Sequence, residues 1–484
     1  MPEHLRALVV IVGLAAVVFA FAKAPACAMA NSIEDFQRRR NLWFAITIAT
    51  FLAQNFWIYI VVVAAMLLLA VPREVNKLAL FFFLMFAVPV IPEQIPGFGI
   101  VKYLFTIHYV RLLALIILLP AFLSLQRHAG TDRFGRLFPD WLIAGYVALN
   151  VALQLPIDTF TNTLRSGVFY SFIDIFLPYY VASRSLKNVK EFKDALMAFV
   201  VAAMVLSIIG IFEFAKHWAL YSVLDDALGI RWDFGNYLLR GDKLRALGTT
   251  GQPIVMGYVM AVAMGFLLYL KRSVPKPTAW GLGFILLIVG LIVPVSRGPW
   301  VGAAAMLLVF LATSPSAASR FAKYALLGAV VFLAVRASPV GPAIVDYLPF
   351  VGTIDDTTVA YRERLLDISI QVIMQNPFFG DLRSIGSPAM QELRQGEGII
   401  DIVNTYAGVG LTSGLVGLSL FAGFFIAVCA GILGRMKSIS DRSSEEYLLG
   451  QALFSTLLGI LVIIFTVSSI TVIPVIYWAV AGLG

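Results

Sequence analysis

The sequence is poor in charge, cysteine and histidine, and each shortage excludes a class of protein. Charged residues make up 13% of the 484 residues, whereas a soluble domain carries about 25%, so this composition cannot build a water-soluble surface. The two cysteines, Cys27 and Cys429, lie far apart in separate apolar stretches, unlike a disulfide framework or a thiolate metal site. The four histidines include no pair spaced four residues apart, so nothing indicates a zinc site on a helix.

Long apolar blocks take the place of the missing charge. Hydrophobic residues account for 60% of the chain, and the mean hydropathy is +0.88. The blocks run for about 15 to 28 residues, enough for a helix to cross a hydrocarbon core of about 30 Å. In lipid the backbone must satisfy its own hydrogen bonds, which favours helices over open strands. We therefore predict an all-α, polytopic membrane protein with about 12 to 14 transmembrane helices.

The basic residues between the blocks predict the orientation. We expect spans near residues 5–22, 42–70, 78–92, 103–125, 140–155, 167–183, 194–214, 247–270, 280–296, 299–313, 322–337, 403–433, 446–465 and 468–483. Arginine and lysine gather in alternate connections, such as 126–139, 184–193 and 434–446, which the positive-inside rule places in the cytoplasm. Both chain ends then fall there too. This spread also explains the net charge of +8 without nucleic acid as a partner.

One basic cluster, Arg38 to Arg40, does not fit this alternation. If 42–70 is a single span, the cluster falls outside, against the positive-inside rule. Three explanations stay open. The block 42–70 is a broken hairpin that turns at Gln54-Asn55, residues 1–30 do not cross fully, or a signal peptide is cleaved near the small residues Ala26 to Ala30.

Two connections on the predicted outer side are too long to be turns. They cover 215–246 and 338–402, and they separate N-terminal helices (1–214), core helices (247–337) and C-terminal helices (403–484). Connections longer than about 15 residues are usually functional or disordered. Aromatic residues and leucine at helical spacing predict that both fold as amphipathic helices over the membrane. A structural cap without a site is the plain alternative.

Arginines gather at span ends on this predicted outer side. Arg240 and Arg245 lead into the span at 247, and Arg297 lies in a tight turn between two apolar runs. Arginine at membrane depth costs at least about 2.5 kcal/mol, so it usually marks a partner or a pathway. Its planar fork suits phosphate oxygens. The pattern indicates a site for a lipid-linked diphosphate, although Arg245 alone could also reach the lipid interface as an ordinary flanking charge.

The long outer connection adds further candidates. Arg362, Arg364 and Arg394 are expected to bind substrate, unless Arg362 and Arg364 merely pair with acids along their own helix face. Glu397 and Asp401 stand four residues apart, so in a helix they would share a face, and their mutual repulsion would make one a stronger base. The alternative is a helix cap in which the acids complement the helix dipole. Asn404 completes the predicted site.

Four stretches follow in order over residues 244–418. They read LRALGTTGQP (244–253), PVSRGPW (294–300), RLL (364–366) with NPFFG (376–380), and DIVNTY (401–406) with GLVGL (414–418). Together they resemble the motifs of the bacterial O-antigen ligase and polymerase superfamily. Arg240 and Gly251 also stand eleven residues apart, a spacing associated with polymerases.

The resemblance implies a membrane-embedded glycosyltransferase of the bacterial inner membrane, active on the periplasmic face without metal, nucleotide or other cofactor. Its donor would be an oligosaccharide on polyprenyl (undecaprenyl) diphosphate, held by Arg245 and Arg297, with a flippase and a chain-length regulator as partners. Asp401 stands where ligases carry histidine, which favours an exopolysaccharide or O-unit polymerase with Asp401 or Glu397 as base.

Other functions stay open at this point. Within the superfamily, the chain could be a ligase that transfers polymer to lipid A-core or to protein. Outside it, the chain could be a non-enzymatic transporter of lipid-linked glycan or a structural subunit of an envelope complex. Transporters often contain inverted repeats and charges at mid-membrane. The sequence suggests neither, because its charged motifs lie at span ends.

Overall fold

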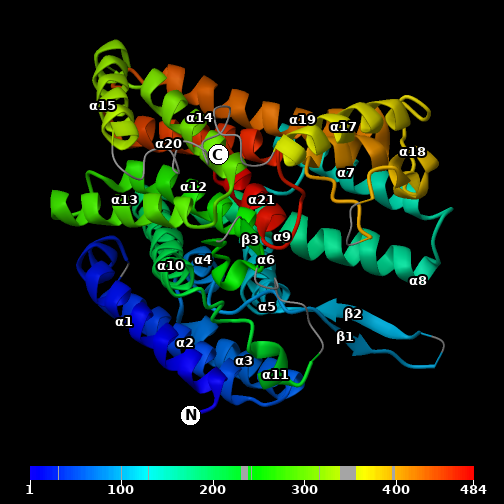
Figure 1. Ribbon diagram of the computed structural model, residues 1–484, viewed down its shortest axis with the longest axis horizontal. Helices are drawn as coiled ribbons and strands as arrows, with labels where there is room; N and C mark the ends of the chain where they lie inside the picture. The colour runs from blue at the N-terminus through cyan, green and yellow to red at the C-terminus, as the bar shows by residue number, and fades with distance from the viewer. Residues whose placement is uncertain are drawn as a thin grey trace. The chain divides into compact units, whose positions relative to one another are not determined.

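The structure, a computed structural model, describes residues 1–30, 32–99, 101–128, 130–230, 238–240, 243–315, 317–337, 356–394 and 398–484. Within them the chain is mostly helical, as Figure 1 shows, and the predicted all-α class is confirmed. The longer helices are α1 (Glu3–Met29), α2 (Ile33–Leu52), α3 (Phe56–Ala70), α7 (Phe138–Gln154), α10 (Val189–Lys216), α12 (Pro253–Leu270), α13 (Pro277–Ile292), α14 (Arg297–Ala312), α15 (Ala317–Ala337), α17 (Asp356–Ile373), α19 (Thr405–Ser438), α20 (Glu445–Ile464) and α21 (Ile473–Leu483).

Shorter elements connect these helices. The short helices are α4 (Lys77–Leu84), α5 (Tyr109–Leu113), α6 (Leu119–Arg127), α8 (Phe160–Asn162), α9 (Leu177–Ser185), α11 (Leu224–Leu228) and α18 (Pro388–Gln391). The 3-10 and π segments are η1 (Val71–Arg73), η2 (Ala114–Leu118), η3 (Thr163–Phe169), η4 (Phe172–Phe176), η5 (Gly248–Thr250) and η6 (Ser384–Gly386). The strands form two antiparallel pairs, β1 (Glu93–Pro96) with β2 (Tyr103–Ile107) and β3 (Leu239–Arg240) with β4 (Lys243–Leu244).

Seven helices in the described residues are long and apolar enough to cross a membrane. They run over Glu3–Met29, Phe56–Arg73, Tyr109–Arg127, Val189–Lys216, Pro253–Leu270, Thr405–Ser438 and Glu445–Ile464. Three shorter apolar helices, α13, α14 and α21, coincide with predicted spans. The protein is therefore a polytopic membrane protein. Several other predicted spans fold as shorter pieces, such as α4, which ends at Leu84 although its apolar block continues to residue 92.

The chain divides into two compact units. The first contains Met1–Arg133, Phe172–Pro299 and Ile470–Leu483, and the second contains Phe134–Ser171 and Trp300–Ser469. In the first unit α10 packs against α1, α4, α12 and α13, and most of its residues are buried. A helix that is apolar on all sides is expected at the centre of a membrane bundle.

The basic cluster that broke the predicted alternation lies at a buried ion network in this first unit. Arg39 is 2% exposed and pairs with Asp194 at 2.7 Å and Glu74 at 2.7 Å. Arg38 bonds to Glu74 at 3.1 Å and also contacts Asp35. Because Asp194 directly follows the basic connection 184–193, Arg39 lies at that same end of the helices. The cluster therefore obeys the positive-inside rule after all.

A chain break explains how the cluster reaches that end. Helix α2 stops at Leu52, Gln54 has a φ of 53°, and Asn55 caps α3 by accepting the backbone N–H of Trp57 at 2.9 Å. The block 42–70 is thus a broken hairpin, which confirms the first of the three explanations. The expectation that both termini share one side fails if α1 crosses, because α1 packs antiparallel to α2 and its N-terminus lies at the far end.

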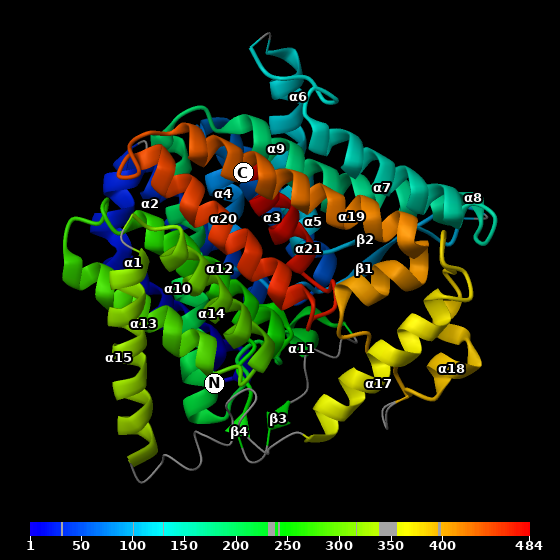
Figure 2. The same cartoon turned by 90° about the horizontal axis from the view of Figure 1, so that it is seen from above.

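In the second unit α19 runs beside α7 and packs against α20 (Figure 2). The helix is interrupted at Gly414, whose φ of 62° and ψ of −165° are not helical. Helix α17 lies on α19 through a small apolar core of Leu365, Ile368, Val372, Met390, Leu393 and Leu411. This core holds the described part of the second long connection against α19; α17 and the short α18 within it are helical as predicted.

The first long connection differs from the prediction. Within its described residues the only helix is α11, which Gly229 ends with a φ of 66°, and the chain then forms the β3–β4 hairpin. In the hairpin, Leu239 pairs with Leu244 and Arg240 pairs with Lys243, as in antiparallel strands. The helix predicted for this part of the connection was therefore wrong. The predicted start of a span at 103 was also wrong, because the aromatic and β-branched residues of β2 pair with β1 instead.

Candidate functional site

The predicted diphosphate-binding arginines meet at one turn of the first unit. The turn consists of Pro294 to Arg297 and joins α13 to α14. Arg245 follows β4, and its backbone N–H donates to the carbonyl of Leu238 at 2.9 Å, which closes the hairpin. The next residue, Ala246, donates its N–H to the Val293 carbonyl at 3.3 Å, which attaches the hairpin to the end of α13.

Two arginine side chains then hold the turn directly. Arg245 donates from Nε to the Pro294 carbonyl at 3.1 Å and from Nη2 to Ser296 Oγ at 2.8 Å. Arg240 donates from Nη1 to the Val295 carbonyl at 2.5 Å. Arg297 is the next residue and begins α14. The sequence prediction placed these three arginines at one site, and in the structure Arg240 and Arg245 bind the residues that lead into Arg297; we call the three the arginine cluster.

The turn has an unusual backbone that suits this role. Val295 has a φ of 49°, in the left-handed region that β-branched residues rarely adopt, and its N–H donates to the Ile292 carbonyl at 2.8 Å. Such strain persists only where surrounding contacts enforce it, and it often occurs at ligand sites. The bonds from Arg240 and Arg245 to the Pro294 and Val295 carbonyls are contacts of that kind.

The cluster concentrates positive charge beside a helix N-terminus. The three guanidinium contacts described above end on carbonyl and hydroxyl oxygens, so those contacts fix the guanidinium groups without cancelling their charge. The first turn of α14 adds the positive end of its helix dipole. Arg245 and Arg297 are partly exposed, whereas Ser296 is 2% exposed. This arrangement can bind an anion with several oxygens.

A buried carboxylate that the sequence analysis missed supports the same segment. Glu213, fully buried near the end of α10, accepts the backbone N–H groups of Gly248 at 2.8 Å, Leu247 at 3.2 Å and Leu220 at 3.0 Å. Two of these donors follow Arg245 by two and three residues. An acidic residue inside an apolar span is by itself a signal of function, and that signal could have singled out Glu213.

The second unit contains the predicted base. Asp401 is exposed and lies in the segment before α19, where Ser468 Oγ donates to its carboxylate at 3.0 Å. The Tyr361 hydroxyl donates to the Asp401 backbone carbonyl at 3.0 Å. The Ser468 bond orients the carboxylate from the segment between α20 and α21, and the Tyr361 bond holds the backbone of Asp401 from α17. Neither Tyr361 nor Ser468 was singled out from the sequence, because both act across long sequence separations.

A shared helix face for Glu397 and Asp401 required a helical segment. The described residues 398–404 are not helical, so this condition is not met there; Glu397 itself lies outside the described residues. The helix cap is Asn404, whose side chain accepts the N–H groups of Tyr406 at 3.0 Å and Ala407 at 3.1 Å. Asn404 forms these bonds because α19 must satisfy its first donors.

The remaining predicted arginines lie in the same unit. Arg364 on α17 pairs with Glu392 at 3.0 Å, and both side chains are more than half exposed. Arg394 donates to Gln391 at 2.6 Å and to the Gly398 carbonyl at 2.8 Å. Arg362 is half-buried on α17. Their role in substrate binding stays a prediction.

One partly buried ion pair contradicts the view that charge is confined to span ends. Arg111, at the start of α5, pairs with Asp174 at 2.7 Å and donates to the Thr106 carbonyl at 2.7 Å. Asp174 lies on η4, in the middle of the predicted span 167–183, and η4 has π-helical geometry. The Arg111–Asp174 pair and the π-helical η4 are thus a polar feature of the first unit in addition to the arginine cluster.

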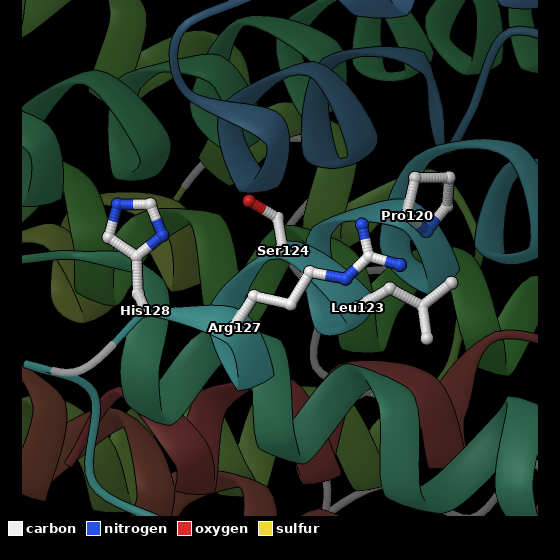
Figure 3. Close-up of a pocket in the computed structure, with 5 residues that line it drawn as sticks. All are labelled: Pro120, Leu123, Ser124, Arg127 and His128. Carbon is white, nitrogen blue, oxygen red and sulfur yellow. The ribbon is translucent and has the colours of Figure 1, made fainter.

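An open hollow of about 420 Å³ lies elsewhere in the first unit, at the end of α6. It is lined by Pro120, Leu123, Ser124, Arg127 and His128 (Figure 3). None of these residues belongs to the predicted site, and they lie at the end of the α5–α6 span that the positive-inside rule places in the cytoplasm. We do not assign the hollow a role in the chemistry.

Comparison with known proteins agrees with the resemblance. The family model described as O-Antigen ligase matches residues 282–422. This region contains the Ser296-Arg297 turn, α17, Asp401 and the first half of α19, whereas Arg240 and Arg245 precede it. No curated protein matches the chain. The chain is therefore a polytopic membrane protein whose residues 282–422 match the family model described as O-Antigen ligase.

Proposed function

We propose that the protein is a periplasmic-face glycan polymerase of the inner membrane. It transfers glycan from a polyprenyl diphosphate donor to a sugar hydroxyl of a lipid-linked repeat unit. The observation that carries this proposal is the arginine cluster, in which Arg240 and Arg245 hold the turn that begins α14 with Arg297. A diphosphate offers two spaced, negatively charged groups of oxygens that several arginines can bind in a forked geometry.

The chemistry assigned to the cluster is stabilisation of the leaving group. The bond between the donor sugar carbon C1 and the diphosphate oxygen breaks, and its electron pair goes to the diphosphate. The acceptor hydroxyl oxygen forms the new bond to C1 with inversion. Charge grows on the diphosphate in the transition state, and fixed positive groups that are already in place stabilise it without reorganisation.

Asp401 is the proposed base that takes the acceptor hydroxyl proton. Its carboxylate is exposed, and Ser468 orients it through a hydrogen bond. A carboxylate here, where ligases of the family carry histidine, favours a polymerase over a ligase. The sequence resemblance further leads us to expect a reaction that needs neither metal nor nucleotide.

Reconstitution of the purified protein in liposomes with lipid-linked repeat units tests this proposal. In EDTA and without nucleotide, we expect elongated glycan and release of polyprenyl diphosphate. Arg245→Ala and Arg297→Ala should each reduce turnover at least about 100-fold, whereas Arg127→Ala, an exposed arginine at the end of α6, should not. Activity that is lost in EDTA and restored by magnesium would contradict the metal-independent reaction.

Two other functions are distinguished by the same assay. A ligase would consume the donor only when lipid A-core is added as acceptor, and would not elongate lipid-linked repeat units. A transporter of lipid-linked glycan is favoured by the partly buried Arg111–Asp174 pair, since charges within apolar helices often mark pathways. Transport would move the donor between leaflets with its diphosphate bond intact, so release of polyprenyl diphosphate excludes it as the sole function.

A further inference from the structure

The segment that connects α17 to α18 presents an apolar surface although it does not cross the membrane. Along the first turns of α17 the exposed side chains include Val359 and then the charged residues Glu363, Arg364 and Asp367. Toward its C-terminal end and beyond, large apolar side chains are exposed at Ile370 (51% exposed), Met374 (62%), Phe378 (66%) and Phe379 (54%), with the exposed polar residues Gln371, Gln375 and Asn376 between them. Large contiguous apolar surfaces of this kind mark sites that contact another protein or a membrane.

Backbone hydrogen bonds attach this segment to the interruption of α19. The non-helical conformation at Gly414 leaves nearby backbone groups without helical partners, and the segment supplies them. The carbonyl of Pro377 accepts the N–H of Leu415 at 2.7 Å, and the carbonyl of Phe378 accepts that of Val416 at 3.1 Å. The N–H of Asp381 donates to the Leu411 carbonyl at 2.8 Å. The depth of Phe378 in the membrane is therefore the depth of Gly414.

The charges on α19 place Gly414 at the edge of the hydrocarbon or inside it. Arg435 and Lys437 end the helix, and residues 415–434 carry no charge. At 1.5 Å per residue these residues extend about 30 Å, the thickness of the hydrocarbon core. Because the uncharged run begins as early as Ile402, α19 has no charge that would hold Gly414 above the lipid.

Irregular backbone at that depth is tolerated only where its polar groups are satisfied by protein. The three hydrogen bonds between the segment and α19 satisfy these polar groups. The two backbones also pack closely against each other at this point. A Cβ atom on Gly414 would lie 2.4 Å from the Phe378 carbonyl carbon, and one on Gly380 would lie 2.6 Å from the Gly414 nitrogen.

We propose that Phe378 and Phe379 insert into the acyl chains of the outer leaflet and anchor the α17–α18 region to the membrane surface. The partner is the lipid itself, and the inserted surface continues the lipid-facing surface of α19, where Leu415 is 45% exposed beside it. This inference concerns membrane contact alone, so it does not depend on the proposed enzymatic reaction.

Nitroxide labels on the full-length protein in liposomes measure this depth. Cys27 and Cys429 are first replaced by alanine, and single labels are placed at Phe378→Cys and Phe379→Cys. Ile426→Cys, 67% exposed in the middle of α19, serves as the lipid reference, and Val359→Cys, 47% exposed near the charged end of α17, serves as the water reference. Oxygen, which concentrates in lipid, and a nickel chelate, which stays in water, report where each label lies.

We expect the labels at Phe378 and Phe379 to show an oxygen-to-nickel collision ratio several-fold above that of Val359 and close to that of Ile426. Nickel accessibility equal to that of Val359 would place the segment in water and overturn the proposal. A label that neither reagent reaches would mean that another protein surface covers the segment, and would overturn it equally. Because all four positions are exposed, the labels need not disturb the fold.

Discussion

Asp401 is the residue whose assigned role is most specific. Its amide replacement, Asp401→Asn, keeps the size of the side chain and can still accept a hydrogen bond from the Ser468 hydroxyl. It cannot remove the proton from the acceptor hydroxyl. General-base catalysis typically contributes about 10²- to 10⁴-fold, so we expect turnover to fall by about that factor while donor binding is kept. Elongation rates at saturating donor provide the measurement.

Asp367→Asn is the matched control, since Asp367 is an exposed carboxylate of the same unit. Near-normal rates in Asp401→Asn would remove Asp401 from the chemistry and leave catalysis to leaving-group stabilisation. Ser468→Ala should have a smaller effect than Asp401→Asn, because it removes the group that orients the carboxylate and not the carboxylate itself.

Glu213 gives a second prediction at the residue scale. Both carboxylate oxygens of Glu213 accept backbone N–H groups, whereas glutamine has only one oxygen that can do so. Its NH₂ group would therefore face a backbone N–H of Leu220, Leu247 or Gly248. An unsatisfied buried donor costs about 1–3 kcal/mol, and we expect Glu213→Gln to lower the thermal unfolding midpoint in detergent. Glu446→Gln, exposed at the start of α20, should leave it unchanged.

If Glu213 also positions Arg245, a second readout should separate that role from simple destabilisation. Well below its unfolding temperature, Glu213→Gln should raise the KM for the lipid-linked donor relative to the parent protein. An unchanged KM together with a lowered midpoint would make Glu213 a stabilising residue alone.

The arginines were predictable from the sequence and their partners were not. Arginine beside an apolar run is conspicuous, because few charges occur there. Among the described partners of Arg240 and Arg245 are the carbonyls of Val295 and Pro294, about 50 residues away, and no residue type announces a backbone acceptor. The helix face assumed for Glu397 and Asp401 illustrates a related point: spacing predicts a shared face only where the chain is helical, and residues 398–404 are not.

At the scale of elements, the interruption of α19 makes a sharp prediction. Gly414 combines a φ of 62° with a backbone contact that leaves no space for a Cβ atom. Such conformations cost side-chain-bearing residues of order 1–3 kcal/mol before any clash is counted. We expect Gly414→Ala to lower the thermal unfolding midpoint clearly.

Gly408→Ala on the same helix is its control. The nearest atom to a Cβ there is a side-chain carbon at 3.8 Å, which is ordinary contact, and alanine is the better helix former. Equal stability of the two variants would show that the interruption is not a fixed feature of α19.

Helices were predicted well because an apolar block long enough to span lipid leaves few alternatives. The break between α2 and α3 was foreseen as an option, since Gln54-Asn55 interrupts the apolar run with polar side chains, and Asn55 acts as a helix cap. The β1–β2 and β3–β4 hairpins were missed. Their strands are short, and in β2 the apolar residues merge with the following span.

At the scale of the whole molecule, the ion network of Arg39, Glu74 and Asp194 predicts the topology. Reporter fusions in 126–139, 184–193 and 434–446 should be cytoplasmic, and a fusion in the connection after α3, near Glu74, should be as well. Fusions in 215–246 and 338–402 should be periplasmic. If α1 crosses the membrane, a reporter at the N-terminus should be periplasmic too.

A cytoplasmic result in 338–402 would contradict the orientation, because Asp401 would then face the wrong side for a periplasmic acceptor. A periplasmic result near Glu74 would contradict the ion network as the explanation of Arg38 to Arg40. The sequence alone could not settle this point, since the decisive contact joins residues 155 positions apart.

The most direct test of the central claim is binding of a polyprenyl diphosphate to the intact protein in nanodiscs. The wild-type protein should bind the diphosphate more tightly than the corresponding monophosphate. Arg245→Lys and Arg297→Lys should each weaken diphosphate binding markedly, because an ammonium group keeps the charge but loses the forked geometry, while Arg127→Lys should bind as the wild type does. Equal diphosphate affinity in the wild type and in both cluster variants would contradict the assignment of the arginine cluster as the donor site.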